Sequence, residues 1–196
     1  MSRAYSALGQ GSIFFRGAEL DDLSAIYALE AASYPEDEAA TRDKLHYRIS
    51  HAPEAFLVAV SSSGGGSGEG GAASAAQEDE IIGYVCGTCS SAATLTHESM
   101  SRHEPEGRLL CIHSVCVAEA RRRKGVATRL LRTYLSYVAA SLPQLEEVRL
   151  LCKQQMVPLY GGVGFVLLGP SPVVHGQEQW LEMAYSWEPP GAEDAA

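Results

Sequence analysis

The sequence has little positive charge. Lys and Arg number 15 against 24 Asp and Glu in 196 residues, a formal net charge of -9. A protein this acidic is not expected to have nucleic acid or an anionic membrane as its main partner. No apolar run approaches membrane-spanning length, and the first ten residues lack the apolar core of a signal peptide. We therefore expect a cytoplasmic protein, with a short organelle-targeting segment as the alternative.

The sequence also lacks a disulfide framework. Its five cysteines are an odd number, and most of them lie in apolar runs typical of strands, which suits reduced, buried thiols. Cys86 and Cys89 have C-x-x-C spacing, but residues three apart on a strand point to opposite faces. No second pair at zinc-like spacing is present. We expect no metal site.

The composition indicates one domain over 12–187, with flexible termini at 1–11 and 188–196. Within it, 61–79 contains Gly, Ser and Ala but no large apolar side chain, so it cannot offset its own ordering entropy. We interpret this stretch as a flexible loop inserted between two antiparallel strands.

Apolar periodicity predicts an α/β fold with a mixed sheet flanked by helices. One parallel crossover is expected between the strands that end at Val117 and begin near Val148. A first helix has apolar residues at helical spacing from Leu20 to Leu29 and is ended by Ser33-Tyr34-Pro35. The other expected helices are 36–51, 124–140 and 156–161, and the expected strands are 12–16, 55–60, 80–89, 109–117, 147–152, 164–168 and 180–186.

The stretch from 109 to 127 carries the clearest chemical signal. A strand containing His113 leads into the basic turn Arg121–Ala127, and a helical pattern follows. The first amides of a helix have no internal partners and its N-terminal dipole end is positive, so this arrangement forms an anion site. It suggests a phosphate-bearing cofactor beside a proton-transferring group. The alternative is a solvated basic turn that only caps a helix.

The order of elements and the Arg122-x-x-Gly125-x-Ala127 turn resemble the GNAT family of N-acetyltransferases, which bind acetyl-coenzyme A. Further segments look like the arylalkylamine (serotonin) N-acetyltransferases of the non-vertebrate type. These are Leu95–Met100, Ile112–Val115, Val157–Tyr160 and Gly164-Phe165. The resemblance spans 12–187, interrupted by the glycine-serine loop, and implies the acyl-coenzyme A N-acyltransferase fold with a twisted mixed sheet.

The resemblance implies that backbone N–H groups of the turn hold the pyrophosphate, with the pantetheine arm running along the preceding strand as an added strand. Glycine lets the backbone come close to the phosphates, and alanine keeps the following turn small. The implied cofactor-binding residues are Val115, Cys116, Val117, Arg122, Arg123, Lys124, Gly125, Val126, Ala127 and Thr128.

The resemblance also implies the catalytic residues. His113 matches the second of two family histidines that relay a proton from the amine, and Cys111 occupies the position of the first. Strand alternation predicts that Cys111, His113, Val115 and Val117 share one face. Tyr160 matches the general acid, because a phenol stays protonated at neutral pH and can donate to the leaving thiolate. The alternatives are a core histidine and a packed aromatic.

The amine pocket is predicted from fewer signals. Trp180 matches a position where the family places an aromatic against the substrate, although it could equally be core at the edge of the last strand. Tyr34-Pro35 begins a loop that closes over the amine in related enzymes, and Cys111 is a further candidate. We interpret Glu38 as a helix-start residue and leave Glu36 and Asp37 open.

The predicted activity is transfer of acetyl from acetyl-coenzyme A to aromatic ethylamines such as serotonin, tryptamine or phenylethylamine, by direct attack in a ternary complex. Serotonin acetylation would connect the chain to melatonin biosynthesis. The alternatives are acetylation of polyamines or other alkylamines, and a non-catalytic acetyl-coenzyme A-binding module. We expect a monomer. No basic cluster lies near either terminus, so we expect no 14-3-3 switch.

Overall fold

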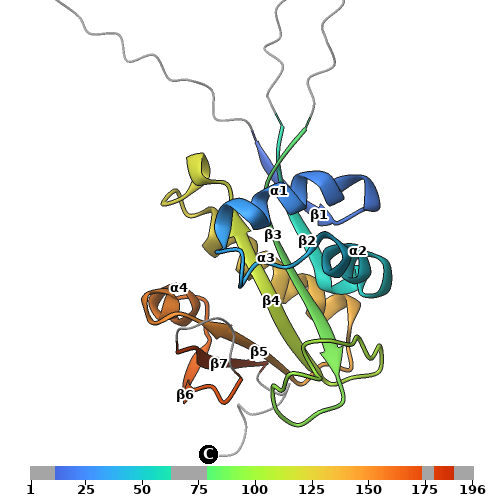
Figure 1. Cartoon of the computed structure of the whole chain (residues 1–196), viewed down its shortest axis with the longest axis vertical. Helices are drawn as coiled ribbons and strands as arrows, with labels where there is room; N and C mark the ends of the chain where they lie inside the picture. Colours follow the sequence, from blue (N-terminus) through green and yellow to red (C-terminus); the bar gives the residue numbers. More distant parts are fainter. Residues whose placement is uncertain (1–11, 63–78, 174–178, 188–196) are drawn as a thin grey trace, which may run out of the picture.

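The computed structural model describes residues 12–62, 79–173 and 179–187 (Figure 1). The predicted flexible termini and nearly all of the predicted loop 61–79 lie outside the described residues. Ser61, assigned to that loop from composition, is instead the buried last residue of a strand. Within the described part, no helix is both long and apolar enough to cross a bilayer.

The described strands form one seven-stranded sheet in the order β1-β2-β3-β4-β5-β7-β6. The β4–β5 pair is parallel and the other neighbours are antiparallel, which confirms the predicted mixed sheet and its crossover. The antiparallel pairing of β2 with β3 confirms that the inserted segment joins neighbouring strands. The strands are β1 Ile13–Gly17, β2 Phe56–Ser61, β3 Glu80–Ser90, β4 Leu109–Val117, β5 Glu147–Cys152, β6 Val166–Pro170 and β7 Leu181–Ser186.

Four α-helices accompany the sheet: α1 Leu23–Ser33, α2 Arg42–His51, α3 Val126–Ser141 and α4 Val157–Gly161. Short 3₁₀ helices are η1 Leu20–Asp22, η2 Pro53–Ala55, η3 Glu119–Arg121 and η4 Gln154–Met156. Helices α1 and α2 lie over one face of the sheet and α3 over the other, while α4 lies beside β6 (Figure 1).

The predicted helix 36–51 begins too early. Helix α2 starts at Arg42, and the Thr41 hydroxyl caps it by accepting from the Lys44 N–H. The segment between α1 and α2 is a turn that lies over the sheet rather than a first helical turn. The acidic residues of this segment therefore neither begin nor cap α2.

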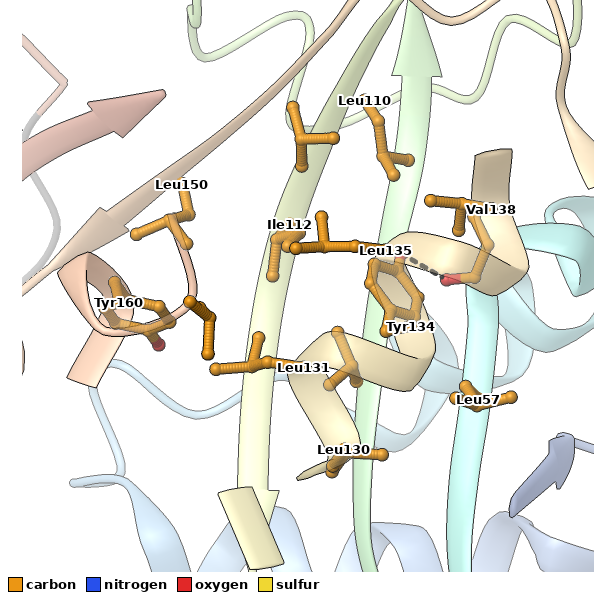
Figure 2. Packing of buried hydrophobic residues seen from close by; sticks show 14 of the residues in the cluster. Leu57, Leu110, Ile112, Leu130, Leu131, Tyr134, Leu135, Val138, Leu150 and Tyr160 are labelled. Carbon is orange, nitrogen blue, oxygen red and sulfur yellow. Dashed lines mark hydrogen bonds between the residues drawn. The ribbon is translucent and has the colours of Figure 1, made fainter. Parts of the chain in front are cut away.

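Two hydrophobic layers hold the sheet. On one face, side chains of α3 pack against Leu110 and Ile112 of β4 and against Leu57 of β2, and Tyr160 of α4 joins the same cluster (Figure 2). The Tyr134 hydroxyl, which is buried in this layer, donates a hydrogen bond to the Ala55 carbonyl at 2.9 Å. Each such buried apolar side chain contributes roughly 1.5–3 kcal/mol, so this layer fixes how α3 meets the sheet.

Strands β4 and β5 separate partway along their length. Their pairing covers Leu109–Ile112 against Glu147–Leu150, yet β4 continues to Val117. Beyond Ile112, the β5-facing edge of β4 keeps backbone groups that the sheet does not use. This separation opens the site.

Candidate active site

A cavity of about 590 Å³ lies where β4 and β5 separate, and a smaller one of about 130 Å³ adjoins it. The larger cavity is lined from β4, from the start of α3, from the segment after β5 and from α4. Both cavities share Tyr34, Glu38, Val115, Tyr160 and Trp180 in their linings. Candidate residues from opposite ends of the sequence thus meet in one place.

His113 lines the smaller cavity and lies at a β-bulge. In the β3–β4 register, Cys86 pairs with Ser114 and Gly87 with Ile112, so His113 is the extra residue. A bulge redirects a side chain and is common next to active sites. The bulge therefore turns His113 toward the cavity instead of leaving it in the regular alternation.

The bulge overturns the prediction that Cys111 shares a face with Val115 and Val117. Cys111 packs with Leu109 in one cluster, whereas Val117 lies in the α3-side cluster on the other face. The extra residue shifts the alternation by one position, which flips every later side chain. Cys111 is fully buried and is not among the residues that line either cavity.

The Cys111 thiol is not a neutral-pH base. Burial raises its pKa to about 11, which outweighs the hydrogen bond to Ser99. The C-x-x-C prediction of opposite faces is confirmed, because Cys86 packs on the α1 side and Cys89 on the α3 side.

His113 has a partner that the sequence did not reveal. Thr88 Oγ1 on β3 lies 2.7 Å from His113 Nε2 and 3.3 Å from the Ser99 carbonyl oxygen. A carbonyl can only accept, so the Thr88 hydroxyl donates to Ser99 and accepts from Nε2–H. This assigns the tautomer in which Nδ1 is the basic nitrogen. In the sequence, this partner is indicated only by a threonine inside an apolar strand.

Tyr160 lies on α4 with its ring in the core and its residue lining both cavities. Pro158 in the first turn suits the helix start, and the Phe165 ring meets the Tyr160 ring edge-on at 5.9 Å. Burial, reinforced by the neighbouring Cys152 and Cys116 thiols, raises the Tyr160 pKa well above its usual value. The phenol is therefore held protonated at neutral pH.

The exposed edge of β4 is occupied by side chains. The Val115 N–H donates to the Tyr34 hydroxyl at 3.3 Å, and the Val117 carbonyl accepts from Arg122 Nε at 3.0 Å. Between them Cys116 points to the opposite face, where its thiol lies 3.2 Å from a Glu30 carboxylate oxygen. An added strand at this edge would replace the Tyr34 and Arg122 contacts.

The basic turn has the geometry of an anion site. Gly125, the N-cap of α3, has φ of 77°, and Arg123 has φ of 59°. The Arg129 N–H bonds to the Gly125 carbonyl, so the three amides before Arg129 precede the first intrahelical bond. The two positive φ values let the chain turn sharply into α3, where unpaired amides and the positive end of the helix dipole favour an anion. Arg122 and Ala127 line the large cavity, which places the anion site beside it.

The remaining turn residues flank the cavity rather than line it. Arg123, Lys124 and Gly125 are exposed, and Val126 is buried in the α3-side core. The predicted contacts of this group are backbone contacts, with which these positions agree. The residues present therefore fit a phosphate-bearing group.

Trp180 lies at the cavity wall beneath a cation. Lys153 Nζ is 4.3 Å from the centre of the indole ring and 2.6 Å from Glu38 Oε1. The interpretation of Glu38 as a helix-start residue is therefore wrong: it precedes α2 and forms an ion pair with Lys153 in the cavity wall. No local sequence pattern indicates this pair, whose members are 115 positions apart. Pro35 lines the large cavity beside them.

Glu30 is a second carboxylate in the cavity lining that was not predicted from the sequence. It is 1% exposed, and its oxygens accept from the Ala40 N–H, the Tyr84 hydroxyl and the Ser114 hydroxyl. It lies on the buried stripe of α1 with Leu23 and Ile26. A carboxylate at core spacing in an apolar helix was the available signal. Its bonds fix the α1–α2 segment over the smaller cavity.

The chain is similar to known acetyltransferases. The family model described as "Acetyltransferase (GNAT) family" matches residues 23–165. A serotonin N-acetyltransferase from Mesocricetus auratus is 30% identical over 110 residues, which is 56% of this chain and 53% of that protein. The chain thus spans about half the length of the curated relatives it matches.

Solved structures share the fold at low sequence identity. The loading GNATL domain of CurA from Lyngbya majuscula has a TM-score of 0.70 at 15% identity, over 89% of this chain and 98% of that one. A GphF GNAT-like decarboxylase in complex with isobutyryl-CoA has a TM-score of 0.67 at 20% identity, over 88% of this chain and 98% of that one.

The predicted fold and the resemblance to this family and to its serotonin N-acetyltransferases are confirmed by these matches. The family model covers most of the sheet, including β4, the basic turn, α3 and Tyr160. This chain belongs to the GNAT family of acetyltransferases.

Proposed function

We propose that this chain is an acetyl-coenzyme A-dependent N-acetyltransferase of small aromatic ethylamines. One observation carries the proposal: His113 and Tyr160 line adjoining cavities, and Arg122 and Ala127 of the basic turn line the larger one. An anion site, a base and an acid are thus held around one space large enough for a thioester and an amine.

Cofactor binding would use the basic turn and the edge of β4 that β5 leaves unpaired. The amides from Arg123 to Thr128 would hold the pyrophosphate, and Val115 and Val117 would pair with the pantetheine arm after Tyr34 and Arg122 move aside. Bound acetyl-coenzyme A supplies the acetyl group as an activated thioester. The role of Cys116 is limited to its backbone, since its side chain lies on the opposite face.

Proton transfer is assigned to two residues. The amine is an ammonium at neutral pH, and His113 takes its proton through Nδ1, the basic nitrogen of the tautomer that Thr88 selects. Tyr160 donates its phenol proton to the departing sulfur. The Cys111 thiol, which is protonated and outside the cavity lining, takes no part, so His113 works without a second histidine.

The amine class rests on Trp180 and on the relatives. The Trp180 indole lines both cavities, and the apolar surface that Lys153 does not cover is available to an aryl ring. The curated relatives carry the name serotonin N-acetyltransferase, which supports serotonin, tryptamine and phenylethylamine as acceptors and a place in melatonin formation. We further propose a cytoplasmic monomer without a metal cofactor.

A polyamine acceptor is the second candidate, because Asp37, which lines both cavities, and Glu30 place carboxylates along the smaller cavity. A polyamine has several ammonium groups that such carboxylates would attract. The competing idea of a non-catalytic acetyl-coenzyme A-binding module predicts cofactor binding without turnover.

The test is steady-state acetylation of tryptamine and of spermidine, followed as thiol release, for the wild type and Tyr160→Phe across pH. We expect turnover on tryptamine and a loss of roughly tenfold or more in kcat in the variant, about 1.4 kcal/mol of transition-state stabilisation. Tyr27→Phe, on the exposed side of α1, is the matched control and should retain wild-type rates. Cofactor binding without turnover on either amine would overturn the proposal. Preference for spermidine over tryptamine would favour a polyamine as the acceptor.

A further inference from the structure

Three separate segments meet at a largely buried ion pair in the cavity wall. Lys153 follows β5, Glu38 belongs to the α1–α2 segment and Trp180 precedes β7. The Lys153 and Glu38 side chains are only 15% and 9% exposed, and Lys153 Nζ also lies over the indole face. Glu38 and Trp180 line both cavities, so this cluster adjoins the space that His113 lines.

A carboxylate beside an aromatic face is a receptor for an alkylammonium group. The carboxylate supplies charge and hydrogen-bond acceptors, and the indole face supplies a cation–π contact. Lysine is itself an alkylammonium on a flexible chain. Lys153 thus fills, from within the protein, the subsite that a ligand ammonium would otherwise enter.

From this occupied subsite we infer that Lys153 determines amine specificity by excluding acceptors that carry a second ammonium group. The distal cation of a diamine or polyamine finds Glu38 and the indole face already taken, and it is repelled by the Lys153 charge. An aromatic monoamine brings only an apolar tail to the same wall and meets neither obstacle. The inference rests on the proposed amine acetylation and names the class of amine that the site rejects.

The pair is positioned for this effect to be strong. Its side chains are largely removed from water, so the charges interact at lower effective dielectric than surface pairs do. Removing Lys153 leaves the Glu38 carboxylate without this cation, which a ligand cation can replace. A site that rejects diamines would thereby become one that attracts them.

The experiment compares kcat/KM for cadaverine with that for phenylethylamine in the wild type, Lys153→Met and Lys153→Arg. We expect the diamine-to-monoamine ratio to rise roughly tenfold or more in Lys153→Met, and to stay near the wild-type value in Lys153→Arg, which keeps the charge. Arg108→Met, which breaks an exposed ion pair with Glu146, is the matched control. Lys153→Gln serves as a second neutral variant should Lys153→Met fold poorly.

The double variant Glu38→Gln with Lys153→Met tests the subsite itself. Without the carboxylate, the gain for cadaverine should disappear. The inference is overturned by an unchanged ratio in the folded neutral variants, or by a gain that persists in the double variant. A binding readout separates this inference from the proposed activity: cadaverine should raise the thermal midpoint of Lys153→Met more than that of the wild type, even if neither amine is acetylated.

Discussion

The hydroxyl of Thr88 is the residue-scale feature that prepares His113. It accepts from Nε2–H at 2.7 Å while it donates to the Ser99 carbonyl, so one side chain fixes both the tautomer and the ring orientation. Thr88 is 1% exposed, so water does not readily take its place. The base function proposed for His113 therefore depends on a group that does not itself line the cavity.

Thr88→Val should lower kcat/KM for tryptamine about fivefold, about 1 kcal/mol, because the imidazole loses its orienting acceptor. The imidazolium loses more than the neutral ring does, so the acidic limb of the pH–rate profile should move to lower pH. Measuring that profile separates orientation of His113 from simple destabilisation. Thr88→Ser, which keeps the hydroxyl, should restore the wild-type limb; a limb that stays in place in Thr88→Val would contradict the assignment.

Single residues differ in how well the sequence predicted them. Tyr160 was singled out through the family resemblance of Val157–Tyr160 and Gly164-Phe165, and in the structure it lines both cavities with its ring edge-on to Phe165. The bulge at His113 was not predicted, because alternation describes regular strands and a bulge shows only in the register with the partner strand. The Glu38–Lys153 pair is long-range, so no local pattern could indicate it.

At the scale of elements, the turn before α3 depends on Gly125. Its φ of 77° is a left-handed conformation that side-chain-bearing residues adopt at a cost, and among the described residues, apart from the adjoining chain, no atom lies within 4 Å of the position a Cβ would take. The penalty for a side chain here is therefore conformational strain rather than a clash.

Gly125→Ala should destabilise the fold by about 1 kcal/mol and weaken coenzyme A binding roughly threefold or more, because relief of the strain rotates the first amides of α3 away from the anion site. Urea unfolding and equilibrium binding measure the two effects. Gly161→Ala is the stability control, since that glycine also has open space around it but lies in α4 without a positive φ. Equal stability loss in both variants would contradict the role of backbone conformation.

Element types were predictable where periodicity was strong, as in β4 and α3. The boundaries of the elements were not predictable in the same way, as the start of α2 shows. The acidic run 36–38 looks like a first helical turn, but the Thr41 hydroxyl caps the helix and the earlier segment is held away by Glu30 and Lys153. Tertiary contacts override a local preference of a few tenths of a kcal/mol per residue, roughly the scale of helix propensity.

At the scale of the whole molecule, an acidic chain builds a local site for an anion. The net charge is -9, yet Arg121–Lys124 gathers four basic residues at one helix start. Three acidic residues have structural partners: Glu30 holds the α1–α2 segment, Glu38 pairs with Lys153, and Asp22 pairs with Arg16. Global charge thus says little about the pocket: the basic turn could be predicted from the local sequence, whereas the partners of these acidic residues became known only from the fold.

The Arg16–Asp22 pair joins the edge strand β1 to the start of the α1 layer and makes global stability depend on pH. Burial by itself raises the pKa of Asp22, but hydrogen bonds from the Arg16 guanidinium and the Glu19 N–H outweigh burial and hold the pKa below its ordinary value. A carboxyl with a lowered folded-state pKa stabilises the protein above the unfolded-state pKa of about 4, and this stability is lost as pH falls through the folded-state value.

Asp22→Asn should therefore lower the free energy of unfolding by about 1–2 kcal/mol at neutral pH, a magnitude reduced by the partial exposure of Arg16. The difference from the wild type should shrink as pH falls below about 4, because the wild-type carboxyl is then also neutral. Urea unfolding at a series of pH values measures it, with Asp21→Asn on the exposed neighbouring residue as the control. A difference that stays constant down to acid pH would mean that Asp22 acts through packing and not through its charge.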